Sequence, residues 1–233
     1  MRASNPRVGQ RVEIAGVAGT GKSTLRKLLC DGNHDGWVVA ESMHARHPAQ
    51  LPYLSAGLHA VLPLVAASAR RGARPEWQDV KDAAYVTVWH RYLAAHADAV
   101  ARTVLLDQGP LFALARLRWV PSPLTAAPEF ASWWQDELTL WARELDGVVW
   151  LDAPDDVLIA RINTRSRFHQ IKNRPTDEAC SFLGESRWTL AAVVDAVSAA
   201  SGVPILAFDT ATTTPEQAAR RVESWAGASV GAI

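Results

Sequence analysis

The sequence predicts an α/β fold in which a five-stranded, mainly parallel sheet carries helices on both faces. Three observations predict it: short apolar runs without polar alternation, helical spacing between those runs, and acidic residues where the runs end. Uninterrupted apolar runs are typical of strands covered on both faces, and their alternation with helices is typical of parallel sheets. The five runs are residues 12–15, 37–40, 103–106, 147–151 and 203–208.

Carboxylates mark the ends of four of these runs. The run ends at, or directly before, Glu41, Asp107, Asp152 and Asp209. Because ligands of open parallel sheets bind beyond the carboxyl ends of the strands, these acids are expected on the ligand-binding side of the molecule.

Length and charge restrict the classes of function. The chain has 233 residues, which suits one domain spanning residues 1–233, and its 24 basic residues balance 24 acidic ones. This balance gives no reason to expect nucleic acid as a partner. Two cysteines, Cys30 and Cys180, are typical of free thiols in a reducing compartment.

The sequence gives no sign of secretion or of a membrane span. The first residues lack a secretory signal. The longest apolar stretch, around AGLHAVLPLVAASA, contains a histidine and a proline and is expected to be too short for a bilayer. We therefore expect a cytoplasmic protein that does not enter a membrane.

A glycine-rich corner follows the first apolar run. Residues 16–23 read GVAGTGKS and match the pattern G-x-x-x-x-G-K-[ST], between a predicted strand and a predicted helix. Such a corner turns successive backbone amides toward phosphate oxygens, while the lysine reaches the β- and γ-phosphates and the hydroxyl ligands Mg²⁺. The sequence thus predicts ATP and Mg²⁺ as cofactors, and it leaves the preference for ATP over GTP open. The residues expected to hold the nucleotide are Gly16, Ala18, Gly19, Thr20, Gly21, Lys22, Ser23 and Thr24.

Two of the strand-end acids are candidates for catalysis. Glu41 follows the second run by one residue and is expected over the phosphate corner, where it can accept the proton of a substrate hydroxyl. Asp107 follows the third run and is expected to bind Mg²⁺ together with Ser23. Which of the two acids is the general base stays open from the sequence.

An arginine-rich segment, ARINTRSRFHQIKNRP, predicts a lid at about residues 161–176. Arg161 and Arg165 are four residues apart and are expected to share one helix face. With Arg167, they could neutralise charge on the transferring phosphoryl group, and a closing lid would exclude water.

Residues 43–102 predict a helical insertion between the second and third strands, broken near RRGARPEW. We expect the phosphate acceptor, a small molecule, to bind beneath it. The candidate acceptor-binding residues are Glu41, His44, Tyr53, Trp77, Tyr85, Trp89 and Arg91.

The motifs together resemble the nucleoside and nucleotide kinase group of P-loop proteins, especially its deoxynucleoside kinase and thymidylate kinase branches. The similar stretches are GVAGTGKST, VVAES, LLDQGP, VVWLDAPDDVLIARINTRSR and PILAFDTATTTPEQAARRV. The resemblance implies a three-layer P-loop kinase fold and transfer of the ATP γ-phosphate. It also implies Glu41 as base, Asp107 as the Mg²⁺-associated acid and the three lid arginines as cations.

Two departures from the group's pattern bear on the acceptor. Gln108 stands where those kinases carry an arginine, and no proline follows Glu41. We count Gln108 among the acceptor-binding residues. Both departures favour an acceptor other than a common nucleotide, such as a modified nucleoside, an antibiotic or a specialised metabolite, as for antibiotic phosphotransferases on the same scaffold.

Two other functions remain open at this stage. A nucleoside monophosphate kinase would need additional cations near the acceptor, and Arg46, Arg70, Arg71 and Arg74 are available in the insertion. A nucleotide-binding regulatory protein would need the P-loop but no acceptor. The oligomeric state is not determined by the sequence, and a homodimer is left open.

Overall fold

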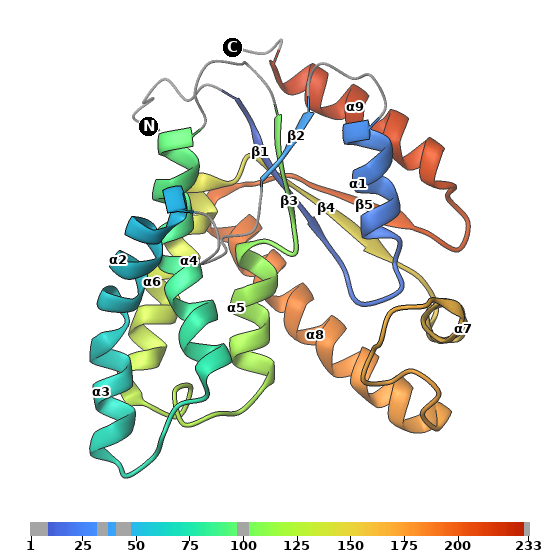
Figure 1. The fold of residues 1–233 in the computed structure, drawn as a ribbon. Coiled ribbons are helices and arrows are strands. Elements are labelled where there is room, and N and C mark those ends of the chain that lie inside the picture. The colour runs from blue at the N-terminus through green and yellow to red at the C-terminus, as the bar shows by residue number, and fades with distance from the viewer. Residues whose placement is uncertain (1–8, 32–36, 41–47, 97–102, 231–233) are drawn as a thin grey trace.

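Five parallel strands form the centre of the molecule. The computed structural model describes residues 9–31, 37–40, 48–96 and 103–230. The strand order is β2-β3-β1-β4-β5, and each neighbouring pair is parallel (Figure 1). The strands are β1 (Arg11–Ala15), β2 (Trp37–Val39), β3 (Thr103–Asp107), β4 (Gly147–Asp152) and β5 (Ile205–Asp209). This is the predicted sheet, with each observed strand starting or ending within two residues of its apolar run.

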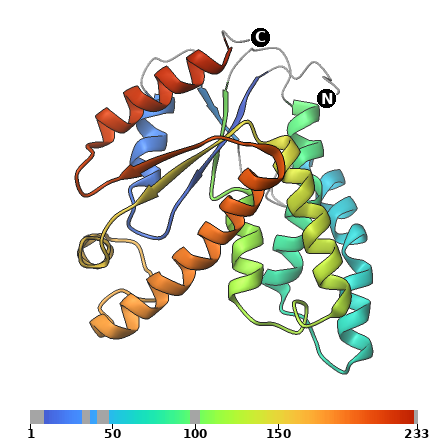
Figure 2. The same cartoon turned by 180° about the vertical axis from the view of Figure 1, so that it is seen from behind.

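Helices cover both faces of the sheet, as Figures 1 and 2 show from opposite sides. On one face, α1 (Lys22–Asp31) and α9 (Pro215–Val230) pack on the sheet through residues such as Leu29 and Val222. On the other face lie α4 (Trp77–His96), α5 (Pro110–Trp119), α6 (Pro128–Glu144) and α8 (Thr176–Ser201). The remaining helices are α2 (Leu51–Ala60), α3 (Leu62–Arg70), α7 (Asp155–Thr164) and the short 3₁₀ helix η1 (Pro48–Gln50). The three-layer α/β fold predicted from the sequence is confirmed.

The alternation of side chains along β1 decides what faces each layer. Val12 and Ile14 belong to the core beneath α1 and α9, whereas Ala15 belongs to the larger core beneath α4, α5, α6 and α8. Because neighbouring residues of a strand point to opposite faces, Glu13 points with Ala15 toward the larger core.

Local sequence signals explain where several helices begin. At the start of α9, the Thr214 backbone N–H donates to the Gln217 side chain (2.9 Å) and the Gln217 N–H donates to the Thr214 hydroxyl (3.3 Å). This is the reciprocal capping expected of Thr-x-x-Gln. Gly227 in the sequence predicts the end of this helix, but α9 continues to Val230. A glycine permits a helix end but does not enforce one.

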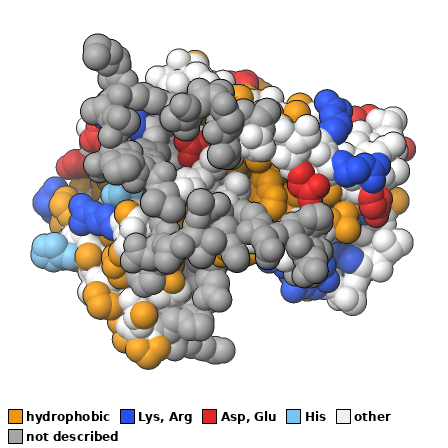
Figure 3. Space-filling view, turned by 90° about the horizontal axis from the view of Figure 1, so that it is seen from above, with side chains coloured by type: hydrophobic (Ala, Val, Ile, Leu, Met, Phe, Trp, Pro, Cys, Tyr) orange, Lys and Arg blue, Asp and Glu red, His pale blue; other side chains and the backbone are white. Residues whose placement is uncertain are grey.

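The predicted insertion contains α2, α3 and α4, and its break lies at residues 71–76, between α3 and α4. The stretch Pro48–Arg70 is long and apolar enough to cross a membrane by length and composition alone, which corrects the expectation that the chain has no such stretch. Here it is not one continuous helix, because α2 ends before Val61, and Val61, Leu64 and Ala67 pack into the larger core. Its outer side lies at the left in Figure 3, where hydrophobic side chains gather.

We predict that Trp141→Ala destabilises the fold strongly. Trp141 on α6 is fully buried, and its Nε1 donates to the Val86 carbonyl of α4 (3.1 Å). Emptying this volume should lower the free energy of unfolding by about 3–5 kcal/mol, measured by urea denaturation. Trp188→Ala is the matched control, because Trp188 is 75% exposed on α8. Its effect should stay within about 0.5 kcal/mol. Equal losses in the two variants would contradict this account of the core.

Candidate active site

The P-loop is the turn between β1 and α1, and its backbone needs glycine. Gly16 has φ 148°, and a Cβ there would lie 2.3 Å from the Leu151 carbonyl oxygen at the end of β4. Gly19 and Gly21 also have positive φ values, both 89°. Side chains therefore cannot replace hydrogen at Gly16, and the turn can approach β4 closely enough to direct its amides toward an anion.

Two side chains fasten this turn from within. The hydroxyl of Thr20, which is fully buried, donates to the Val17 carbonyl (2.9 Å). The Lys22 Nζ donates to the Gly16 and Val17 carbonyls at 2.7 and 2.8 Å. Burial lowers the pKa of Lys22 to about 8; nearby Asp107 opposes this shift and Arg165 adds to it. A polyanion on the P-loop would supply the negative charge that favours the charged ammonium form.

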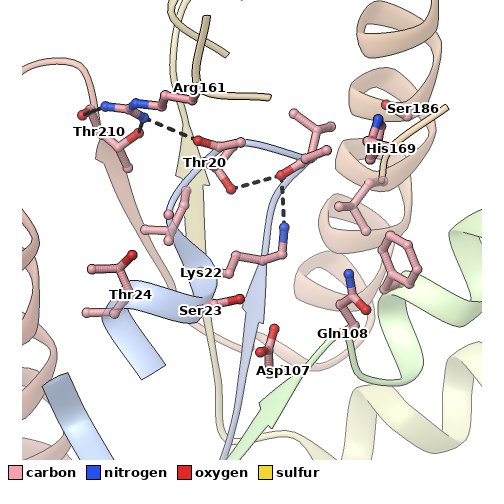
Figure 4. A pocket seen from close by; sticks show the side chains of 18 of the residues that line it. Thr20, Lys22, Ser23, Thr24, Asp107, Gln108, Arg161, His169, Ser186 and Thr210 are labelled. Carbon is pink, nitrogen blue, oxygen red and sulfur yellow. Dashed lines mark hydrogen bonds between the residues drawn. The ribbon is translucent and has the colours of Figure 1, made fainter. Parts of the chain in front are cut away.

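A cavity of about 910 Å³ opens beside the P-loop. Its walls come from the P-loop, the end of β3, α5, the segment after α7, α8 and the loop between β5 and α9. Figure 4 shows Arg161 and Thr210 on one side of the P-loop and Gln108, His169 and Ser186 on the other. The cavity thus has room on two sides of Lys22, as a reaction between two bound molecules requires.

All eight residues predicted to hold the nucleotide form the P-loop turn or the start of α1. Seven of them, from Ala18 to Thr24, line the cavity, and Gly16 lies behind them against β4. Ser23 and Asp107, the predicted Mg²⁺ ligands, both line the cavity. Figure 4 shows their side chains directed toward each other. The Asp107 carboxylate also lies 3.6 Å from the Arg26 guanidinium of α1. A hydroxyl and a carboxylate are oxygen donors of the kind Mg²⁺ prefers, so the two residues fit the ion together with phosphate oxygens.

The three lid arginines differ in their surroundings. Helix α7 ends at Thr164 and Arg165 has extended backbone (ψ 151°), so Arg161 and Arg165 do not share a helix face as expected. The Arg161 guanidinium donates to the Thr210 carbonyl (2.7 Å), the Thr210 hydroxyl (2.9 Å) and the Gly19 carbonyl (3.3 Å). It therefore links the P-loop to the loop after β5. Arg165 and Arg167 line the cavity, and Arg165 is close enough to Lys22 to affect its pKa.

The acceptor residues predicted in the described part of the insertion do not line the cavity. Trp89 is 1% exposed and stacks with Tyr85 (4.2 Å between ring centroids), while Tyr53 packs on Tyr92 (5.4 Å). Trp77 is 62% exposed at the start of α4, and Arg91 is exposed on the same helix. The physical reason is that aromatic residues on apolar helices contribute most of their area to the core.

The remaining predicted acceptor residues are Gln108, which lines the cavity, and Glu41 and His44, which the structure does not describe. Gln108 lines the cavity and has φ 54°, a conformation uncommon outside glycine. Glu41 and His44 lie outside the described residues, so their roles stay predictions. The last described residue before Glu41 is Ala40, whose N–H donates to the Leu105 carbonyl of β3 (2.9 Å).

Residues from one face of α5, one face of α8 and the segment after α7 form the rest of the cavity. The sequence suggests Trp119 as a further wall of the pocket, whereas it does not single out Phe112, Arg116, His169, Phe182 and Ser186. Burial and the nearby cations Arg165 and Lys22 lower the pKa of His169. Only the i, i+4, i+7 spacing of 112, 116 and 119 hinted at a shared face, and that spacing is equally typical of core packing.

Glu13 was also missed, and it positions the turn that carries Asp107 and Gln108. It is fully buried, and its carboxyl oxygens accept the N–H groups of Leu111 (3.1 Å) and Phe112 (3.2 Å) in the first turn of α5. A Cβ on Gly109 would lie 2.7 Å from the Glu13 Cδ. Glu13 therefore satisfies the free amides of α5 at the point where the chain leaves β3.

We predict that Glu13→Gln changes how stability depends on pH. Burial raises the pKa of Glu13 from 4.5 to about 8, against the three backbone N–H donors, and Asp107 contributes in the same direction as burial. The folded state thus retains a proton that the unfolded state loses above pH about 4.5. The free energy of unfolding should therefore fall as the pH rises from about 4.5 to about 8, by at most about 1.4 kcal/mol per pH unit.

Urea denaturation at pH 5, 6, 7 and 8 measures this slope. Glu13→Gln should flatten it, whereas Glu129→Gln, at an exposed position of α6, should leave it unchanged. Parallel stability curves for the wild type and Glu13→Gln would contradict the raised pKa.

Comparison with known proteins identifies the fold. No family model matches the sequence, and no curated protein matches it. Among solved structures, the chain is similar to a deoxyadenosine kinase from M. mycoides with bound dCTP, at 12% identity and TM-score 0.54, over 93% of this chain and 98% of that chain. The same kinase with dCMP and dCDP as products gives the same values. A shikimate kinase from Bacteroides thetaiotaomicron has 14% identity and TM-score 0.48, over 93% and 97% of the two chains. The chain has the α/β fold of P-loop kinases.

Proposed function

We propose that this protein is an ATP- and Mg²⁺-dependent kinase that transfers the γ-phosphate to a hydroxyl group of a small molecule. One observation carries the proposal: the cavity that contains the P-loop continues past Lys22 to a second set of walls on α5 and α8. A protein that only binds a nucleotide needs no such second space. The deoxyadenosine kinases of the same fold support an acceptor with a hydroxyl group.

The P-loop would bind the triphosphate through its backbone amides and Lys22. The Lys22 Nζ donates to the carbonyls of Gly16 and Val17. Phosphate oxygens would replace these carbonyls as partners and restore the positive charge that burial disfavours. Mg²⁺ held by Ser23 and Asp107 would supply charge neutralisation on the phosphate oxygens.

The transfer step joins the acceptor oxygen to the γ-phosphorus and breaks the bond between that phosphorus and the β–γ bridging oxygen. The electron pair of the broken bond stays on the departing ADP, and the acceptor hydroxyl loses its proton. Glu41 is our candidate for the group that receives this proton, since in the sequence it comes two residues after β2, and β2 is the neighbour of β3, the strand that ends at Asp107. Arg165 and Arg167 would offset charge on the transferring group, while the segment 161–176 would limit access of water.

A phosphate acceptor, as in a nucleoside monophosphate kinase, is less consistent with the charges. Arg70, Arg71 and Arg74 are exposed and do not line the cavity, and Arg46 lies outside the described residues. The one described arginine on the α5 wall, Arg116, is already paired with two aspartates of α4, Asp79 and Asp82. A dianionic acceptor would find little uncompensated positive charge there.

We predict that Lys22→Ala lowers kcat/KM by far more than tenfold. The ammonium group would meet charge that develops on the phosphates, and its loss should remove several kcal/mol of transition-state stabilisation, where about 1.4 kcal/mol corresponds to tenfold. The measurement is acceptor-dependent ADP formation. Lys27→Ala, at an exposed position of α1, is the control and should retain activity. A loss below tenfold would refute the assigned contact of Lys22.

We predict that Glu41→Gln abolishes most transfer while ATP affinity stays within about threefold, because the amide cannot accept the proton. Binding of ATP by titration calorimetry and product formation are measured on the same preparation. Glu129→Gln should behave as wild type. ADP formation that is independent of the acceptor and unaffected by Glu41→Gln would favour the regulatory nucleotide-binding protein instead.

A further inference from the structure

Two helix faces oppose each other in the part of the cavity that the nucleotide motif does not explain. Helix α5 contributes Phe112, Arg116 and Trp119, and α8 contributes Phe182 and Ser186. Spacings of four and seven residues place each set on one side of its helix. Both helices run downward from the sheet in Figure 1, on the side away from α1 and α9.

An aromatic pair lies between these two helices. The rings of Trp119 and Phe182 meet edge to face, 4.5 Å apart between centroids and at 70°. The Trp119 Nε1 donates to the Glu185 carboxylate (3.4 Å), which fixes the indole against α8. The rings of His169 and Phe182 also meet edge to face, with centroids 5.9 Å apart and an angle of 88° between the ring planes. Such a wall offers ring faces and edges to a flat, apolar group.

Arg116 of α5 lies beside this wall and can donate a hydrogen bond to a bound molecule. Its Nη2 donates to Asp79 (2.9 Å) and its Nε donates to Asp82. No described residue accepts a hydrogen bond from Nη1, so this nitrogen is the part of the guanidinium available to a bound molecule. The two aspartates of α4 hold the plane of the guanidinium, so its direction is set before any ligand arrives.

The charge around Arg116 selects against ionic ligands. Asp79 is 1% exposed, and its Oδ2 has no hydrogen-bond partner within the described part of the chain. Two carboxylates therefore compensate the Arg116 guanidinium, so Arg116 itself offers no excess positive charge to a phosphate or carboxylate. The only acidic residue among the described lining residues is Asp107, so a polycation would also lack counter-charges.

We propose that the α5–α8 end of the cavity is the acceptor subsite and that it takes an uncharged alcohol with a planar ring bearing a carbonyl group. The ring packs on Trp119 and Phe182, and Arg116 donates from Nη1 to the carbonyl oxygen. Ser186 and Gln108 supply neutral polar contacts. This inference rests on the proposed kinase function, because that function makes the occupant an alcohol.

Binding is measured by titration calorimetry with the full chain, Mg²⁺ and the ATP analogue that carries NH in place of the β–γ bridging oxygen. The probes are uridine (uncharged, planar, carbonyl), adenosine (planar, no carbonyl), uridine monophosphate (dianionic) and kanamycin (polycationic, no planar ring). Uridine should bind at least tenfold more tightly than each of the other three. Tighter binding of adenosine, uridine monophosphate or kanamycin, or no binding of uridine, overturns the assignment.

Two variants test the role of Arg116 without leaving Asp79 and Asp82 unpaired. Arg116→Lys keeps the charge and loses the planar fork, so KM for uridine should rise about tenfold with kcat within about threefold. Asp79→Asn keeps a hydrogen-bond acceptor and removes one negative charge. It should therefore raise the affinity for uridine monophosphate relative to uridine by about fivefold. A purely structural role would not change this preference.

Arg118→Lys is the matched control, because Arg118 is exposed on the same helix, stacks over Trp134 at 4.6 Å and does not line the cavity. It should leave both KM and the preference unchanged. An unchanged preference in Asp79→Asn, with the variant folded as judged by circular dichroism, overturns the role of the ion pairs.

The same experiments separate the two proposals. If uridine binds with the expected dependence on Arg116 but no alcohol stimulates ADP formation, the subsite stands and the kinase function fails. If adenosine or kanamycin is phosphorylated and uridine is not, the kinase function stands and the subsite assignment fails.

Discussion

The close approach of Gly16 to the Leu151 carbonyl is the constraint on which the site depends. A Cβ at Gly16 would lie 2.3 Å from that oxygen, so β1 and β4 can reach their present separation at this level only with glycine there. The approach brings the P-loop to the edge where β3 delivers Asp107 and where the loop after β5 delivers Thr210. Arg161 then joins Gly19 to Thr210 and completes the wall of the cavity on that side.

A buried carboxyl has the corresponding role on the other side of β1. Glu13 points away from the layer of α1 and α9 and accepts two N–H groups at the start of α5. The direction in which α5 leaves the sheet is thereby coupled to the central strand, and Gly109 leaves the room that the carboxyl needs. The face of α5 with Phe112 and Arg116 is thus held relative to the P-loop by a group that itself touches neither the cavity nor solvent.

The distribution of charge divides the cavity into two environments. Burial, with a smaller contribution from Arg165, lowers the pKa of Lys22, and Asp107 opposes the shift. An anion bound beside Lys22 would favour its charged form. Arg116, by contrast, is compensated by Asp79 and Asp82. This difference is the basis on which we propose a polyanion beside Lys22 and an uncharged group at the α5–α8 end, although both sides contain arginine.

The sequence by itself determined the sheet, the P-loop and the position of Asp107, because these depend on local patterns. Apolar runs specify buried strands, glycines specify the turn, and an acid directly after a strand must lie at the carboxyl edge of the sheet. It also located the helices between β2 and β3 and their break.

Only the tertiary structure decided which side chains share the cavity beyond the P-loop. Tyr85 and Trp89 look like pocket residues in the sequence but pack in the core, whereas Trp119 and Phe182, 63 positions apart, meet across the cavity. Arg161 and Arg165 are separated in role because α7 ends between them. Such placements depend on how helices dock on the sheet, which is set by the fit of whole faces and not by the spacing of residues within any one segment.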